Sequence, residues 1–183
     1  FDFVIDLHHN LRSFRVKNAL KCPAFSFDKL NLKKWLLVNT GINLLPPVHI
    51  VQRYMDTVAT LGVKYDGQGL DFHLPASIAA STDTILEDQF PQLHTTPYIA
   101  FVIGATHATK RLPEHKIIEI CQQLSMPVVL LGGPSEVPAG QRIAASTPNV
   151  VDTCGRLSLF QSAELVRRAQ AVITHDTGLM HIA

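Results

Sequence analysis

The second half of this 183-residue chain repeats one unit: a short apolar run, a polar loop and a stretch with helical periodicity. The apolar runs lie at residues 98–103, 127–131, 150–151 and 171–174. Short runs of this kind, rich in β-branched residues, are typical of strands buried on both faces of a parallel sheet. Their alternation with helices predicts an α/β fold with helices on both faces. Because such connections are right-handed, the loops that follow the strands are expected along one edge of the sheet.

The helices between these runs have their own signals. Pro113 stands where the first residue of a helix is expected. A second helix is expected over residues 136–146. Ser158 and Gln161 form a capping box for a third helix, which is expected to end near Gln170.

The segment after the last strand, residues 175–183, is predicted to bind an anion. A turn that leads into a helix presents free backbone N–H groups and a partial positive charge. Thr177 can donate a hydroxyl, Gly178 lets a phosphate approach the backbone, and His181 lies one turn further on. Asp176 is an acid at the mouth of the site, suited to sugar hydroxyls or a nearby cation. The alternative is that Asp176 or Thr177 only caps the helix.

The other loops along this edge also carry groups that suit a ligand. Thr106 can donate a hydroxyl, and Lys110 can neutralise a diphosphate. After the second strand, two glycines allow close approach of a planar ligand, and Glu136 can accept both hydroxyls of a ribose. Leu157 can present its backbone to the edge of a base. Taken singly, these features also fit a solvated Lys–Arg pair and plain turns.

Several classes of protein are disfavoured. A phosphate-binding Walker motif and a G-x-G-x-x-G fingerprint are both absent from the sequence, so neither an ATPase nor a dinucleotide-dependent dehydrogenase fits. The formal charge of +1 gives no footprint for nucleic acid. No apolar run reaches ~18 residues, the length needed to span a membrane. The cysteines and histidines lack metal-ligand spacing, so no metal is expected, and the cysteines are interpreted as reduced thiols of a cytosolic protein.

The first half of the chain is less regular. Strands are expected over residues 3–7 and 24–27, and helices over 11–20, 32–38 and 49–61. A polar stretch punctuated by glycine and proline follows. We therefore assign residues 1–75 to a first domain, 76–96 to a linker region and 97–183 to a second domain.

Several of these motifs resemble those of glycosyltransferase family 9, the lipopolysaccharide heptosyltransferases. The final segment, DTGLMHIA, is similar to the family signature D-[TS]-G-x-x-H-x-A. The likeness extends to IGATHATKRLP, LLGGP and GRLSL in the second half, and to FDFVIDLHHNLRS and HIVQRY in the first half. Leu112 stands where many members have Trp, which affects packing more than chemistry.

The resemblance implies a fold of the GT-B type, with two Rossmann-like domains built on parallel sheets. The second would bind the nucleotide-sugar donor ADP-heptose and the first would bind the acceptor. In this assignment the diphosphate is held by Thr106, Lys110, Thr177, Gly178 and His181. Asp176 contacts the transferred sugar or orients Lys110. Leu157 contacts adenine, and Glu136 contacts the ribose. On the acceptor side, Arg12 follows the first strand, although a surface arginine in a basic helix is the alternative.

The reaction that the resemblance implies is inverting transfer of a heptose, or a similar sugar, to a lipopolysaccharide core or lipid A acceptor. Neither a metal nor a cofactor is required. The family's general base is expected before Phe1 and its last helices after Ala183, so both domains are expected to be incomplete and this segment alone inactive. The expected location is the cytoplasm, with peripheral association at the inner membrane left open. The alternatives are a non-catalytic nucleotide-binding module and a nucleotide-sugar epimerase.

Overall fold

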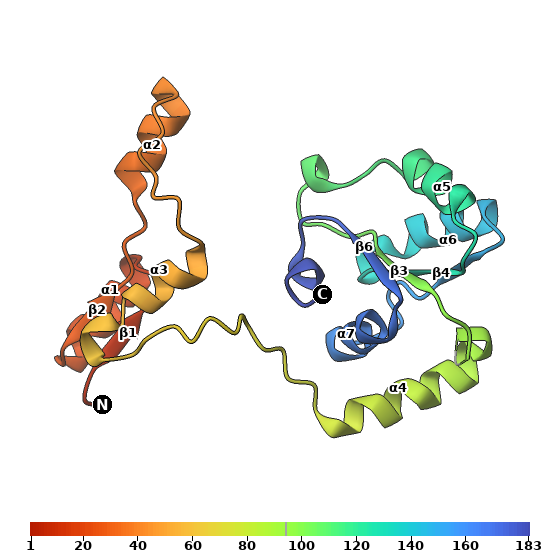
Figure 1. Cartoon of the computed structure of the whole chain (residues 1–183), viewed down its shortest axis with the longest axis horizontal. Coiled ribbons are helices and arrows are strands. Elements are labelled where there is room, and N and C mark those ends of the chain that lie inside the picture. Colours follow the sequence, from red (N-terminus) through yellow and green to blue (C-terminus); the bar gives the residue numbers. More distant parts are fainter. Residues whose placement is uncertain (94) are drawn as a thin grey trace. The chain divides into compact units, whose positions relative to one another are not determined.

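The computed structural model describes residues 1–93 and 95–183. The chain divides into two compact units, Phe1–Leu70 and Asp71–Ala183 (Figure 1). Each unit contains a parallel sheet, so the α/β class predicted from the repeated pattern is confirmed.

The sheet of the second unit has four parallel strands in the order β5-β4-β3-β6. These strands are β3 (Ile99–Val102), β4 (Val128–Leu131), β5 (Val150–Asp152) and β6 (Ala171–Thr174). The chain moves outward from β3 through β4 to β5, then returns to place β6 on the other side of β3. The strand order therefore reverses next to β3, and in open α/β sheets ligands bind at the carboxyl ends of strands beside such a reversal.

Helices cover both faces of this sheet (Figure 1). One face packs against α5 (Glu114–Gln123) and α6 (Val137–Ser146), and the other against α7 (Leu159–Arg168) and α4 (Ala76–Gln89). The capping box predicted for α7 is confirmed, because Ser158 Oγ accepts the N–H of Gln161 and Gln161 Oε1 accepts the N–H of Ser158. Pro113 precedes α5 as its N-cap rather than serving as its first residue.

Alternation along the strands divides the core into two layers. Ala100 and Val102 of β3 lie in the layer with Leu165 of α7, whereas Phe101 lies in the layer with Ile117 of α5. All four residues of β3 are buried, as are all four of β4. This explains why the two strands read as continuous apolar runs rather than as alternating ones.

The segment assigned to a linker, residues 76–96, takes a different form in its described part. Residues 76–89 are the helix α4, and Leu86, Phe90 and Leu93 lie in the core of the second unit. The boundary between units falls after Leu70. The sequence indicates only a short helix near Ile85, because the exposed face of α4 is rich in Ala, Ser and Thr, which blurs the helical periodicity of its few large apolar residues.

The first unit is a β-α-β arrangement followed by further helices. Its parallel strands are β1 (Val4–Asp6) and β2 (Ala24–Ser26), and its helices are α1 (Leu11–Leu20), α2 (Asn31–Thr40) and α3 (Ile50–Asp56). The helix expected over 49–61 ends at Asp56, and a 3₁₀ turn covers Ala59–Leu61.

The end of β1 is held by the buried carboxylate of Asp6. Its Oδ1 accepts the backbone N–H groups of His8 and His9, and its Oδ2 lies 2.7 Å from Lys17 Nζ. Burial opposes the charged form, but Lys17 and these N–H groups outweigh it and hold the pKa of Asp6 well below its usual range. Within residues 1–70 the buried side chains are those of Asp6 and Phe27, so this unit has little apolar core of its own.

An ionic cluster joins α4 to α7. Arg168 pairs with Asp83 of α4 at 2.5 Å and with Glu164 at 2.7 Å, and Glu164 also pairs with Arg167 at 2.6 Å. The Glu164 side chain is only 2% exposed. The hydrogen bond from Arg167, followed by that from Arg168, overcomes the effect of burial and lowers the pKa of Glu164 from 4.5 to about 2.

We expect Glu164→Gln to lower the free energy of unfolding at pH 7 by roughly 1.5–3 kcal/mol, the range for hydrogen bonds to charged groups. Because the folded-state pKa lies below the unfolded one, wild-type Glu164 stabilises the fold above pH ~4.5 and loses this effect as the pH falls toward 2. Urea denaturation between pH 7 and pH 3 should show the two proteins converging. A constant difference across that range would contradict the assignment.

Candidate functional site

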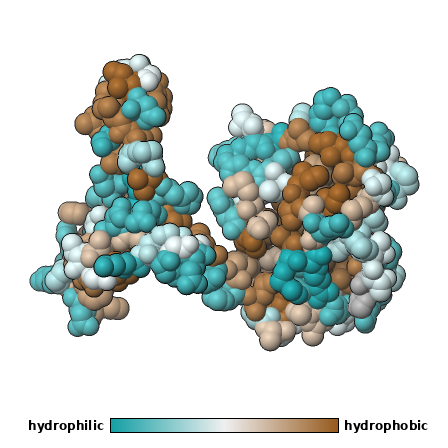
Figure 2. Space-filling model, viewed as in Figure 1, coloured by the Kyte–Doolittle hydropathy of each residue, from teal (hydrophilic) through white to brown (hydrophobic). Residues whose placement is uncertain are grey.

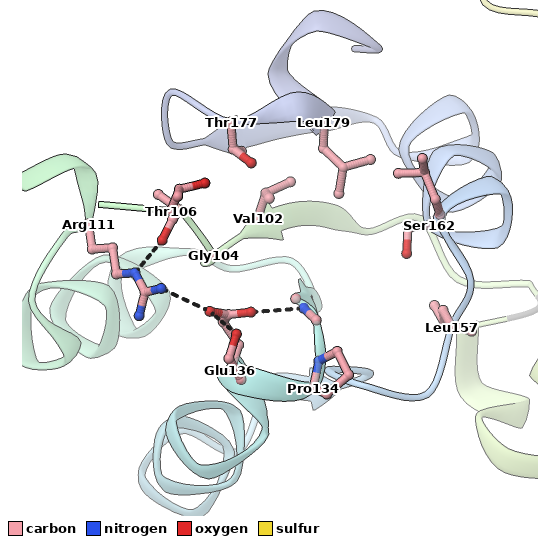
Figure 3. A pocket seen from close by; sticks show the side chains of 15 residues that line it. Val102, Gly104, Thr106, Arg111, Pro134, Glu136, Leu157, Ser162, Thr177 and Leu179 are labelled. Carbon is pink, nitrogen blue, oxygen red and sulfur yellow. Dashed lines mark hydrogen bonds and ion pairs between the residues drawn. The ribbon is translucent and has the colours of Figure 1, made fainter. Parts of the chain in front are cut away.

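A cavity of about 460 Å³ opens at the carboxyl edge of the second sheet (Figure 3). Its lining includes residues that follow each of the four strands: Gly104 and Thr106 after β3, Gly133 after β4, Leu157 after β5 and Thr177 after β6. The sequence predicted that these loops share one edge of the sheet. The structure brings them around a single cavity at the point where the strand order reverses.

The loop after β3 is closed by Arg111. Its Nε donates to the Ala105 carbonyl at 2.6 Å, and its Nη2 lies 3.4 Å from Glu136 Oε1 (Figure 3). The guanidinium therefore fixes both ends of this loop and ties it to the loop after β4. The sequence alone indicates Arg111 only as a neighbour of Lys110 in a basic pair, so this role comes from the structure.

Glu136 lies on the cavity wall and is 7% exposed. Its Oε2 accepts the N–H of Gly133 at 3.0 Å, and its Oε1 accepts the hydroxyl of Ser135 at 2.9 Å. Because Arg111 also lies near Oε1, the Glu136 carboxylate links the loop after β3 to the loop after β4. Ribose binding by Glu136 remains a prediction, and it would have to add to these bonds.

The predicted partners Lys110 and Asp176 meet across the site. Lys110 Nζ lies 2.5 Å from Asp176 Oδ2, with the two side chains 42% and 58% exposed. The hydrogen bond from Lys110 lowers the pKa of Asp176. Asp176 thus holds a cation, and the residue at the N-cap of the following turn is Thr177. An exposed pair of this kind contributes little stability. Neither residue lines the cavity, but each directly precedes a residue that does, Arg111 and Thr177.

The turn after β6 is a 3₁₀ helix, Gly178–His181, in place of the α-helical start that was expected. Thr177 lines the cavity, and its side chain makes no capping bond within the turn. Gly178 and His181 are exposed and follow directly. Of these residues, Thr177 lines the cavity while Gly178 and His181 do not, and the Thr177 hydroxyl makes no capping bond.

The other side of the cavity is apolar. Leu157, Leu179, Val102 and Pro134 line it, with the hydroxyl of Ser162 among them (Figure 3). A flat apolar ring would find van der Waals contacts there, next to polar backbone groups. Leu157 lines the cavity, and its contact with a base stays a prediction.

His175 was absent from the predicted site. It precedes Asp176, and its Nε2 accepts the backbone N–H of Leu112 at 3.1 Å. Its ring meets the ring of Phe101 edge-on, with centroids 6.4 Å apart. Burial is the largest cause of its lowered pKa. Its position at the end of a buried strand was the available signal, since the carboxyl ends of such strands form ligand sites.

In the first unit, Arg12 is exposed on α1, just after the N-cap residue Asn10. A separate cavity of about 300 Å³ in that unit is lined by residues that include Phe27 and Arg53, whose guanidinium lies 4.8 Å from the Phe27 ring centre. The acceptor-side role of Arg12 remains a prediction. Across residues 1–93 and 95–183, no group of three metal-ligating side chains is assembled, and no helix is long and apolar enough to cross a bilayer.

The family model described as glycosyltransferase family 9 (heptosyltransferase) matches residues 1–183. The chain belongs to glycosyltransferase family 9. The resemblance drawn from the sequence motifs is thereby confirmed across both units.

Known proteins of this family share recognisable sequence and fold with the chain. Lipooligosaccharide heptosyltransferase 2 of Haemophilus influenzae is 30% identical over 122 residues, which is 61% of this chain and 35% of that protein. The structure of E. coli ADP-heptose lipopolysaccharide heptosyltransferase II superposes on all of this chain with a TM-score of 0.72 and 21% identity, over 59% of its own length. The E. coli heptosyltransferase WaaC with ADP gives a TM-score of 0.64 at 21% identity, over 58% of its length.

At these identities the structural likeness establishes the fold, and it confirms the GT-B class. The chain spans about a third of the Haemophilus relative and under three-fifths of the two E. coli structures. The parallel two-unit architecture is thus shared with heptosyltransferases, whereas the chemistry must be argued from the site.

Gly132 has a packing role that differs from the one expected. A Cβ at this position would lie 2.7 Å from Glu136 Cβ and 3.0 Å from Cys154 Sγ. The absence of a side chain lets the loop after β4 fold against Glu136 and so shapes the cavity wall. Close approach of a planar ligand is therefore not needed to explain this glycine.

We expect Gly132→Ala to destabilise the fold by roughly 1–3 kcal/mol, the usual effect of overpacking a dense core. Gly178→Ala is the matched control, because a Cβ there would meet no atom within 4 Å. Thermal denaturation should show a lower Tm for Gly132→Ala and a nearly unchanged Tm for Gly178→Ala. Equal melting temperatures for the two variants would refute the packing role.

Proposed function

We propose that the whole protein is an inverting glycosyltransferase that moves a heptose, or a similar sugar, from an ADP-sugar to a lipopolysaccharide core or lipid A acceptor. The second unit of this chain would bind the donor. The observation that carries the proposal is the Lys110–Asp176 pair, which joins the loops after β3 and β6 next to the cavity-lining residues Arg111 and Thr177. Membership of the family and the ADP bound by the related WaaC support it.

The site has the two halves that an ADP group requires. Lys110, Thr106 and Thr177 supply a cation and hydroxyl donors on one side, which suits the diphosphate. The apolar side around Leu157 and Leu179 suits the adenine ring. Gly178 and His181 lie beyond Thr177 and would complete the diphosphate site with a backbone N–H and a ring N–H.

In the proposed reaction, an acceptor hydroxyl oxygen attacks the anomeric carbon from the face opposite ADP. The bond from the anomeric carbon to the phosphate oxygen breaks, and ADP leaves with the electron pair. The hydroxyl proton passes to a general base, which we place outside residues 1–183. Lys110 and the donors around Thr177 would stabilise the negative charge that develops on the leaving diphosphate.

Asp176 would act on the cation or on the sugar. Its carboxylate accepts a hydrogen bond from the Lys110 ammonium group. When the diphosphate arrives, Lys110 can contact both anions, since an ammonium group has three N–H donors. The remaining oxygen of Asp176 then stays available to a hydroxyl of the transferred sugar.

We expect Lys110→Ala to weaken ADP binding by roughly 1.5–3 kcal/mol, or about 10- to 150-fold, because a hydrogen bond to a charged phosphate is lost. Adenosine, which lacks phosphates, should bind to the variant and to wild type alike. Lys116→Ala is the matched control, since Lys116 pairs with Glu119 on the surface of α5. Isothermal titration of each protein measures these affinities.

The opposite results would be informative. Equal loss of ADP and adenosine binding in Lys110→Ala would mean that the substitution disturbs the fold and that the lysine does not bind phosphate. Binding of ADP by the full-length protein without any sugar transfer would instead favour a non-catalytic nucleotide-binding module.

We further propose that the protein works in the cytoplasm, associated peripherally with the inner membrane. The segment from residue 29 to residue 55 contains no acidic residue, and Lys29, Lys33 and Lys34 flank the start of α2. Leu32, Trp35, Val38, Ile42 and Leu44 are more than half exposed, and Figure 2 shows apolar side chains over α2. Basic and apolar side chains on one exposed helix suit the headgroup region of an anionic bilayer.

We expect this protein to sediment with phosphatidylglycerol vesicles and much less with phosphatidylcholine vesicles. Replacing Lys33 and Lys34 with Glu should weaken binding at least tenfold, because each basic residue contributes ~1 kcal/mol near an anionic surface. Lys116→Glu is the control in the second unit. Trp35 is the single tryptophan, so a blue shift of its fluorescence reports insertion directly. Undiminished binding by the double variant would argue against this surface.

A further inference from the structure

The loop after β3, residues 103–113, carries both Thr106 and Lys110, so its position determines where these groups face the cavity. Arg111 closes the loop on itself through Ala105 and joins it to Glu136 after β4. Neither bond reaches the segment after β6. Two bonds that join this loop to residues 175–183 are Leu112 N–H to His175 and Lys110 to Asp176, and the backbone of Ile103 and Gly104 also interacts with the His175 ring.

These two bonds differ in how firmly they can fix the position of the loop. The Lys110–Asp176 pair is exposed on both sides, and exposed pairs contribute little stability and weaken with salt. The Leu112 N–H···Nε2 bond is made to the backbone, and the imidazole that accepts it is half-buried against Phe101. The backbone bond is therefore the better candidate for fixing the loop, with the lysine placed two residues away from it.

From this geometry we propose that His175 is a positioning residue: its imidazole Nε2 accepts the Leu112 N–H and so holds the loop after β3 where Lys110 meets Asp176 and the diphosphate. This inference rests on the proposed function for the diphosphate site. It adds a residue that the sequence motifs did not single out, and it gives the neighbour of Asp176 a role distinct from that of Asp176 itself.

The protonation state of the ring supports this role. An Nε2 atom that accepts an N–H carries no proton, so the neutral ring must hold its proton on Nδ1, a buried atom that has no hydrogen-bond partner among the described residues. Burial, together with the charge of nearby Arg111, lowers the pKa of His175, against the backbone of Ile103 and Gly104, which raises it. The ring is accordingly neutral at pH 7 and able to accept.

Three variants separate the acceptor from the rest of the side chain. His175→Phe keeps a ring against Phe101 and removes the acceptor. His175→Gln places an amide oxygen near the position of Nε2, whereas His175→Asn places one near the position of Nδ1. We expect His175→Phe and His175→Asn to weaken ADP binding about three- to tenfold, the effect of one hydrogen bond, and His175→Gln to restore most of it. Adenosine binding should change in none of them.

Spectroscopy of the wild-type chain provides a measurement that does not depend on any variant folding. In ¹⁵N NMR spectra of histidine-labelled protein, His175 should appear as the neutral Nδ1–H tautomer, and the Leu112 amide should exchange slowly with solvent. An Nε2–H tautomer, or a rapidly exchanging Leu112 amide, would overturn the proposal. Equal ADP affinity of the Gln and Asn variants, or wild-type affinity of His175→Phe, would overturn it as well.

Different results would refute ADP binding at this site and the positioning role of His175. If wild type binds no ADP, the proposed function fails, while the tautomer and the Leu112 exchange rate still report whether His175 holds the loop. If ADP binds and depends on Lys110 but not on the acceptor at position 175, the proposed function stands and the positioning role is refuted.

Discussion

The pairing of β3 with both β4 and β6 is the constraint on which the rest of the second unit depends. Hydrogen bonds hold β3 between these strands, with Phe101 opposite Leu130 on one side and Ile173 on the other. After β3, the chain therefore continues on one side of this strand, through β4 and β5, and then crosses to form β6 on its other side. This reversal leaves an opening at the carboxyl ends of the strands, because the loops on its two sides turn away from each other. The cavity lies at that opening.

The side chains that would act on a ligand are held far less firmly than the sheet. Lys110 and Asp176 are exposed, so their attraction is screened by water and salt. Their meeting depends on the buried strands beneath them and on bonds to the backbone. Arg111, Glu136 and His175 supply those bonds, and each connects loops that are far apart in sequence. The Lys110 cation is thus weakly paired, whereas the loops that carry it are held by stronger bonds from Arg111, Glu136 and His175.

The difference between local sequence patterns and contacts between distant segments also explains what the sequence could predict. The four strands, their common edge and the capping box of α7 depend on local patterns, and all are found in the structure. The family resemblance named Lys110 and Asp176, and the structure brings them together. The link that Glu136 makes with Arg111 and the hydrogen bond that His175 accepts from Leu112 both join segments more than 20 residues apart. No local pattern encodes such contacts.

Two other departures have a similar origin. The helix α4 was assigned to a linker because its Ala, Ser and Thr residues hide the periodicity of Leu86 and its neighbours, and only packing against α7 shows which unit it belongs to. Gly132 was interpreted through a ligand, whereas its neighbours Glu136 and Cys154 account for it by packing. In both cases the deciding atoms belong to a distant part of the chain, which a sequence read in order does not reveal.

A crystal structure of the protein with ADP would show directly whether the second unit binds the nucleotide. We expect the diphosphate to lie within hydrogen-bonding distance of Lys110 Nζ and the Thr177 hydroxyl, with adenine against Leu157. A nucleotide bound in the first unit, or a diphosphate that makes no contact with Lys110, would contradict this expectation.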